Sequence, residues 1–383
     1  MYLTRDEELM LAGEYGEAVQ EAMNILVKVG ELLGAERLVS ISHAHASGVS
    51  YGTIGDPGLH WLKSLASRGA RARVYATVNP IGFDPFKVIP KVDKEFYLKQ
   101  MEIIKAFEQM GFEPTLTCTP YYLREPKPFE RLAWGESNAV AYANSVLGAF
   151  TNREGGPVTV AAAITGKIYE AGLQVLENRR PNFVVKLPAL EDYAEYAAAG
   201  FKIGEIVGTK IPFITFEKRP ETWEVKALLA ASAASGGVAL AVLEGITPSG
   251  TYIIDDRMEK IEIGKEEIEE LIGSIEDVDL VYHGCPHASM EELKLLDSVI
   301  KSKVTKEFWV SVAPKIYMRA KSLVESLERK GVKVLRGTCP VVAPLRNFKR
   351  IATTSAKTYF YLKRKGFDVS IVRLSEVGSL AVR

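Results

Sequence analysis

Cysteine is scarce in this sequence, with only three among 383 residues. An odd and low number of cysteines argues against a disulfide framework. It is typical of proteins from a reducing compartment, so we expect a cytoplasmic protein.

Several other features are missing. No apolar run reaches the roughly eighteen residues of a membrane span, and residues 1–8 are charged from the start, unlike a signal peptide. The 48 basic and 48 acidic residues cancel, and no basic block occurs, which argues against nucleic acid as the main partner. Neither a P-loop nor a glycine-rich dinucleotide fingerprint is present, so an ATPase is not expected.

What is present is an alternation of short apolar runs and amphipathic segments. We expect a helix over residues 6–34, a glycine-rich loop over 42–58, strands over 158–164, 182–187 and 212–216, and helices over 167–176, 190–199 and 221–233. Such alternation is typical of an α/β protein with largely parallel sheets. The length indicates two or three subdomains.

All three cysteines follow a run that reads as a buried strand. The runs are Pro114 to Thr117, Val278 to Tyr282 and Val332 to Leu335, and Gly, Thr or Pro ends each one. Ligands bind at the carboxyl ends of strands in open α/β sheets, so the thiols of Cys118, Cys285 and Cys339 could share one site. The alternative is that each is a small buried hydrophobe.

Ligands at short spacing, as in most zinc sites, are absent around these cysteines. Three separated thiolates suit an iron–sulfur cluster better, because they leave one iron open. An open iron can act as a Lewis acid on a substrate hydroxyl. His287, two residues after Cys285, is a candidate for a hydrogen bond that supports one of these ligands.

The loop over residues 42–58 could be an anion cradle. Its backbone N–H groups and hydroxyls would do the binding, from the segment Ser47, Gly48, Val49, Ser50 and Tyr51. The alternative is a simple turn. His43 and His45 lie two apart on strand-like backbone in this loop, hence on one face, as metal ligands, proton carriers or satisfied core residues.

No charged residue occurs between Glu136 and Arg153. Polar side chains recur there at helical spacing, so this helix should face protein or a pocket. Ser137, Asn138 and Ser145 are candidate substrate contacts. Arg153 is either a structural ion pair or a carboxylate clamp. The helix start at Lys357 is either a plain cap or an anion site.

These motifs resemble the aconitase X family. The likeness rests on SHAHASGVSYGTIGD (residues 42–56), WGESNAVAYANSVLG (134–148), TNREGGP (151–157), HGCPH (283–287) and RGTCPVV (336–342). It covers essentially the whole chain, whose subdivisions we expect near 1–130, 131–275 and 276–383. The resemblance implies an aconitase-like fold, with several three-layer subdomains around a central cleft.

The resemblance also implies a hydro-lyase, with Cys118, Cys285 and Cys339 holding an iron–sulfur cluster, most simply 4Fe–4S with one open iron. Ordinary aconitases carry a Cys-x-x-Cys pair, from which this chain departs, as aconitase X does. The implied reaction dehydrates mevalonate 5-phosphate to anhydromevalonate 5-phosphate.

The family has fused and split forms. The fused form carries a small swivelling domain, which this chain lacks, so we expect a separate small subunit that also supplies the catalytic base. One alternative is dehydration of another hydroxy acid such as cis-3-hydroxy-L-proline. Another is a metal-dependent regulatory or RNA-binding protein, against which the neutral charge argues.

Overall fold

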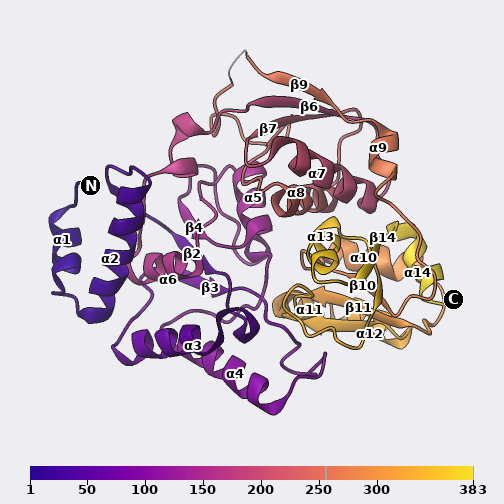
Figure 1. Cartoon of the computed structure of the whole chain (residues 1–383), viewed down its shortest axis with the longest axis horizontal. Coiled ribbons are helices and arrows are strands. Elements are labelled where there is room, and N and C mark those ends of the chain that lie inside the picture. The colour runs from indigo at the N-terminus through magenta and orange to yellow at the C-terminus, as the bar shows by residue number, and fades with distance from the viewer. Residues whose placement is uncertain (255–256, 383) are drawn as a thin grey trace.

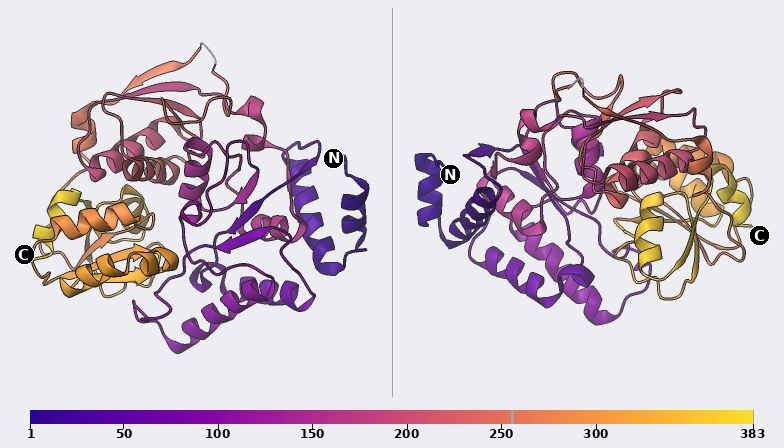
Figure 2. Two further views of the ribbon diagram at one scale, coloured as in Figure 1. Left: turned by 180° about the vertical axis from the view of Figure 1, so that it is seen from behind. Right: turned by 45° about the horizontal axis from the view of Figure 1, so that its top comes forward.

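The computed structural model describes residues 1–254 and 257–382. Within these ranges the strands form three parallel sheets and one antiparallel pair, and helices pack on them in three units (Figure 1). This confirms the predicted α/β class with largely parallel sheets. The N-terminal helices, α1 (Arg5–Ala12) and α2 (Glu17–Leu32), and the sheet nearest the C-terminus lie at opposite ends of the molecule (Figure 2). No helix in these ranges is long and apolar enough to cross a membrane.

The first unit is built on the sheet β3-β2-β4, whose central strand β2 is buried at all four residues. Helix α6 covers this sheet and packs on α2, while α3 packs on α4. The elements are α1 (Arg5–Ala12), α2 (Glu17–Leu32), β1 (Leu38–Ser40), β2 (His43–Ala46), α3 (Tyr51–Ser67), β3 (Tyr75–Val78), α4 (Lys94–Gln109), η1 (Pro120–Tyr122), β4 (Leu132–Trp134), α6 (Gly156–Thr165) and β5 (Lys167–Tyr169), with β5 antiparallel to β1.

The second unit contains the parallel sheet β8-β7-β6-β9 and two closely packed helices, α7 and α8. Helix α5, which precedes α6 in the chain, packs on α8, so the segment after β4 contacts both units. The elements are α5 (Ser137–Ser145), η2 (Gly172–Gln174), η3 (Leu176–Asn178), β6 (Phe183–Leu187), α7 (Tyr193–Val207), β7 (Pro212–Phe216), α8 (Thr222–Ser235), β8 (Val242–Leu243), β9 (Glu259–Glu262) and α9 (Lys265–Glu269). The subdivisions near residues 130 and 275 stay a prediction.

The third unit is a parallel sheet of order β12-β11-β10-β13-β14. The order reverses between β10 and β13, and a crevice for ligands is expected where the carboxyl ends of two such strands separate. The elements are β10 (Leu280–His283), α10 (Met290–Val299), β11 (Glu307–Val312), α11 (Pro314–Arg319), α12 (Lys321–Arg329), β12 (Lys333–Arg336), β13 (Arg350–Thr353), α13 (Ala356–Arg364), β14 (Asp368–Ile371), η4 (Leu374–Glu376) and α14 (Val377–Leu380). Cys285 follows β10 and Lys357 follows β13, so both lie at this crevice.

Some predicted elements are wrong. Residues 6–34 form two helices, because Gly13 closes α1 with a φ of 92° and α2 begins after Gly16. The loop over 42–58 instead contains β2 and the first turns of α3. The strand over 158–164 is helix α6, and the helix over 167–176 is β5 with two short 3₁₀ turns. Helix α6 is buried almost all round, so it lacks the polar face that distinguishes a helix from a strand in sequence.

Strands β10 and β12 confirm two of the three strands expected before the cysteines. The prediction of a strand before Cys118 is wrong. Leu116 takes a φ of 45°, which breaks the extended backbone, although the Thr117 N–H still donates to the Val78 carbonyl at 3.2 Å.

The contact between α7 and α8 allows a test of the fold. A Cβ added at Gly200 would overlap the backbone carbonyl of Leu228, so Gly200→Ala should force the helices apart. We expect a loss of about 1–3 kcal/mol in the free energy of unfolding, measured by urea denaturation. Gly273→Ala is the control, because the nearest atoms to its added Cβ are 3.8 Å away. An equal loss in both variants would contradict this account.

Candidate functional site

One cavity, of about 310 Å³, is lined by all three cysteines. Its walls come from the first unit, from residues 135–137 at the start of α5, and from the third unit. The lining residues are Ser47, Gly48, Val49, Ser50, Thr53, Asn79, Pro80, Cys118, Gly135, Glu136, Ser137, Arg153, Cys285, Cys339, Val341, Val342, Lys357 and Tyr361. The three thiols, which are more than 50 residues apart in sequence, therefore meet at one site, and none is in a disulfide.

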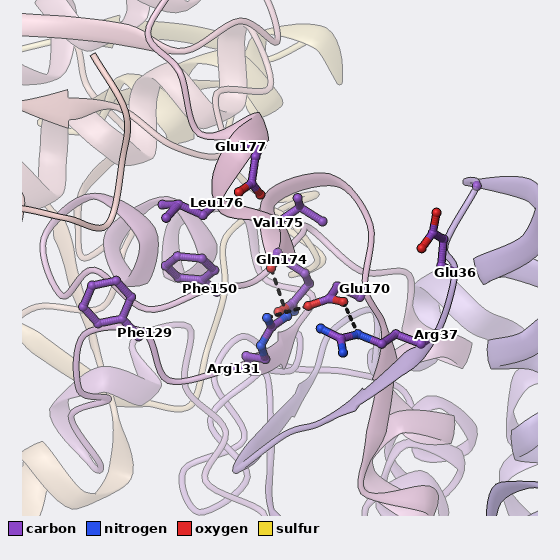
Figure 3. A pocket seen from close by; sticks show the side chains of 11 residues that line it. Glu36, Arg37, Phe129, Arg131, Phe150, Glu170, Gln174, Val175, Leu176 and Glu177 are labelled. Atoms are coloured by element: carbon purple, nitrogen blue, oxygen red, sulfur yellow. Dashed lines mark hydrogen bonds and ion pairs between the residues drawn. The ribbon is translucent and has the colours of Figure 1, made fainter. Parts of the chain in front are cut away.

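A larger hollow, of about 550 Å³, is lined by residues next to β1 and β5 and by the 3₁₀ turns η2 and η3 (Figure 3). Its two arginines, Arg37 and Arg131, both pair with Glu170, at 2.5 and 2.6 Å. Because these cations already have an anionic partner and no cysteine lines this hollow, the cysteine cavity is the better candidate site.

Each cysteine is held by its backbone. The Cys118 carbonyl accepts a hydrogen bond from Asn138 Nδ2 at 2.7 Å, and the Cys285 carbonyl accepts one from Ser355 Oγ. The Cys339 N–H donates to the Ile81 carbonyl at 2.9 Å. Before Cys285, Gly284 has a φ of 108° and lies against the Ser311 backbone, so a side chain there would displace the loop.

Burial raises the pKa of all three thiols, that of Cys339 to about 12, while the Lys357 ammonium opposes this shift. The thiols are therefore protonated when nothing binds them. A metal would have to displace these protons, as thiolate ligation requires.

His287 joins the three cysteine segments. Its backbone N–H donates to Cys118 Sγ at 3.2 Å. Its ring lies 3.0 Å from the Thr338 carbonyl through Nε2 and 3.3 Å from Thr117 Oγ1 through Nδ1. Burial lowers the pKa of His287 to about 4, so the ring is neutral. A carbonyl can only accept, so the proton is assigned to Nε2.

Lys357 lines the cavity and is almost fully buried. Its Nζ lies 2.5 Å from Glu136 Oε1 and 2.7 Å from Asn138 Oδ1. Asn79 Nδ2 donates to the other Glu136 oxygen at 2.7 Å. Burial alone would raise the pKa of Glu136, but Lys357 and Asn79 outweigh it and the pKa falls to about 2.

Of the ten predicted substrate contacts, seven line the cavity: Ser47, Gly48, Val49, Ser50, Ser137, Arg153 and Lys357. The other three do not. The Tyr51 hydroxyl pairs with Asp56 and Lys99 on an exposed side of α3. Ser145 Oγ accepts from the Ala241 N–H at 2.9 Å, and Asn138 lies behind the wall, between Lys357 and the Cys118 carbonyl.

Sequence reasoning missed Glu136, Asn79, Thr53 and Tyr361. Glu136 had a usable signal, since it is the carboxylate at the start of a long stretch without charge. Asn79 had none, because it comes after a short strand without a recognisable motif.

Comparison with known proteins identifies the family. Three family models match in succession: the aconitase X first domain over residues 1–177, the second domain over 181–273 and the third domain over 278–383. The chain belongs to the aconitase X family.

Individual members of the aconitase X family agree with this. The chain is 40% identical to the phosphomevalonate dehydratase large subunit of Thermococcus kodakarensis, over 99% of both chains. It superposes on the crystal structure of Thermococcus kodakaraensis aconitase X (holo-form) with a TM-score of 0.91, at 37% identity and 99% coverage of both. It is 32% identical to the cis-3-hydroxy-L-proline dehydratase of Hypocrea jecorina, over 94% of this chain but 65% of that protein. The predicted family is confirmed.

The lowered pKa of Glu136 in this aconitase X chain predicts a pH dependence. An unfolded carboxyl group has a pKa near 4.5, against about 2 in the fold. The ionised carboxylate therefore stabilises the fold fully above pH 4.5, and this contribution is lost as the pH falls toward 2. Between pH 6.5 and pH 4 the wild-type chain should lose about 1 kcal/mol through this group.

The measurement is urea denaturation at both pH values for the wild-type chain and Glu136→Gln. The amide keeps an oxygen for Lys357 but takes up no proton, so the stability gap between the two proteins should narrow in acid. A constant gap would show that Glu136 does not titrate in this way.

Proposed function

We propose that this chain is the large subunit of a phosphomevalonate dehydratase, a cytoplasmic hydro-lyase that removes water from mevalonate 5-phosphate across C2–C3. The observation that carries the proposal is the cavity in which three free thiols meet Lys357 and Arg153. Support comes from a relative of that name, 40% identical from end to end.

An iron–sulfur cluster fits this cavity. Among the described residues, no three His, Cys, Asp or Glu side chains gather closely enough for a single metal ion, but the cysteines of a cluster bind its separate irons. The His287 N–H···S bond to Cys118 and the nearby Lys357 cation both favour thiolate sulfur. We propose that Cys118, Cys285 and Cys339 hold a 4Fe–4S cluster, whose open iron would supply a Lewis acid for the tertiary hydroxyl.

The chain's own residues bind the substrate anions. Arg153 is exposed, lines the cavity and has no carboxylate partner among the described residues. The Ser50 hydroxyl is buried without a hydrogen-bond partner, and it lies at the start of α3, where backbone N–H groups favour an anion. We assign Arg153 and the segment Ser47–Ser50 to the carboxylate and phosphate, and Lys357 with Ser137 to orienting the polar carbon skeleton.

The base is proposed to come from the partner. Both Glu136 oxygens are already engaged, by Lys357 and Asn79, and His287 is occupied at both ring nitrogens. Neither side chain is free to accept the C2 proton. We therefore place the base, and the swivelling domain that carries it, on a separate small subunit, as the large-subunit name of the relatives suggests.

Dehydration of cis-3-hydroxy-L-proline is the second candidate, since a dehydratase of that name is 32% identical. About one third of that relative lies outside the match, as expected for a form that carries its small domain in one chain. The phosphate-compatible cationic rim at Arg153 favours the phosphorylated substrate.

The chain with its small subunit should dehydrate mevalonate 5-phosphate in preference to cis-3-hydroxy-L-proline. Cys339→Ser should remove the visible iron–sulfur absorption and lower the rate by about 10³-fold, because loss of a Lewis acid costs several kcal/mol. Iron and sulfide content and product formation are measured anaerobically. The control is Val341→Ala, which lines the same cavity without a ligand atom. Full activity without iron would refute the scheme.

Arg153→Gln tests the anion contact. A hydrogen bond to a charged group should be lost, so kcat/KM for mevalonate 5-phosphate should fall about 10- to 100-fold with an unchanged cluster spectrum. Arg180→Gln is the matched control, because Arg180 is an exposed arginine that lines a neighbouring hollow with Arg153 but not the cysteine cavity. Equal losses in the two variants would indicate only a general charge effect.

A further inference from the structure

Neither the sheet β8-β7-β6-β9 nor helices α7 and α8 of the second unit contribute a residue to the lining of the cysteine cavity, yet one side chain of α8 reaches the loop between β10 and α10, which carries His287. Lys226 of α8 is 1% exposed, and its Nζ donates to the His287 carbonyl at 2.9 Å. The same Nζ pairs with the carboxylate of Glu292, which is fully buried in α10. This ion pair therefore links the second unit to the loop between β10 and α10.

Glu292 is tied to the same loop. Its Oε2 accepts a hydrogen bond from the Ser289 N–H at 2.8 Å, and its own N–H donates to Ser289 Oγ at 3.2 Å. Its Oε1 has no hydrogen-bond partner and lies 3.4 Å from His283 Nε2, which also has none. On its other side, His283 Nδ1 meets Thr354 Oγ1 at 2.7 Å. The Lys226–Glu292 ion pair is thus connected through His283 to the ends of β10 and β13, the two strands that border the crevice.

A buried ion pair is a poor way to hold two units together. Removing two charges from water costs free energy that their attraction often does not recover, and apolar side chains of similar size serve equally well or better. An ammonium group, however, has three N–H donors. It can hold a backbone carbonyl and a carboxylate at once, which no apolar side chain does.

Lys226 holds His287, the residue whose backbone N–H contacts the proposed ligand Cys118. The His287 carbonyl is fixed by Lys226, its ring by Thr338 and Thr117, and its N–H points at Cys118 Sγ. We propose that Lys226 and Glu292 are positioning residues: they fix the His287 backbone and thereby the N–H···S hydrogen bond to Cys118. The inference rests on the proposed function only in taking Cys118 as a cluster ligand.

Loss of the Lys226 anchor should change two measurable quantities, the reduction potential of the cluster and the amide exchange of the loop. Hydrogen bonds to sulfur raise the reduction potential of an iron–sulfur cluster, so losing the anchor should shift the potential to a more negative value. In the chain without cluster, amide exchange of the peptide that contains His287 should become about fivefold faster, the factor of one ordinary hydrogen bond.

The test compares three variants: Lys226→Met, the double variant Lys226→Met with Glu292→Gln, and Lys330→Met. The double variant leaves net charge unchanged and no lone buried carboxylate, so it keeps the test valid if the single variant does not fold. Lys330→Met is the matched control. Lys330 also holds a carbonyl and a carboxylate, both of Asp297 in α10, at 2.6 and 2.7 Å, but neither bond reaches the loop that carries His287.

Amide exchange is measured by mass spectrometry on the chain without cluster, and the potential by an anaerobic redox titration of the complex with its small subunit. The inference is supported if the double variant shows both changes and Lys330→Met shows neither. It is overturned if the folded double variant matches the wild type, or if Lys330→Met changes both quantities equally. A wild-type complex that binds no cluster would refute the proposed function, whereas the exchange measurement would still decide the positioning role.

Discussion

The site depends on one neutral imidazole. The His287 ring binds the backbone or hydroxyl next to Cys339 and Cys118, while its own residue follows Cys285 by two positions. Burial keeps this ring uncharged, so it can hold two neutral partners without a counter-ion in the cavity. Three segments that are remote in sequence are thereby fixed to one another through a single side chain.

Two buried ion pairs lie around this imidazole, on opposite sides of the loop that carries it. Lys357 with Glu136 lies on the cavity side, and Lys226 with Glu292 lies behind the loop. The burial of each ammonium is tolerable only because a carboxylate and further polar groups take its hydrogens. Of the cations that line the cavity, Arg153 alone among the described residues lacks such a partner, which leaves it available to an anion from outside.

Sequence reasoning could go far with residues whose neighbours in the chain form a motif. The strands before Cys285 and Cys339, the α/β class and the family follow from local patterns, and the structure and comparisons confirm them. The prediction of a strand before Cys118 failed because a positive φ at Leu116 leaves no periodic signal. The prediction of a strand over residues 158–164 failed because helix α6 is buried on all sides and therefore has no polar face. The contacts Asn79–Glu136 and Lys226–Glu292 are long-range, joining residues 57 and 66 positions apart, and no local pattern encodes them.

The spacing of the cysteines also bears on how the site assembles. Ligands from the first and third units can meet only if those two units are correctly placed relative to each other. The structure fixes this placement with protein contacts alone. The Ile81 carbonyl accepts from the Cys339 N–H, the Ile81 N–H donates to the Gly337 carbonyl, and the Asp84 carboxylate accepts from the Arg336 backbone and guanidinium. Since these bonds are made by protein groups alone, they would hold the three thiols together in the chain without the proposed cluster. The binding energy of such a cluster would then add to the stability of a preformed site, whereas in a small metal-dependent domain the same energy is consumed in folding the chain.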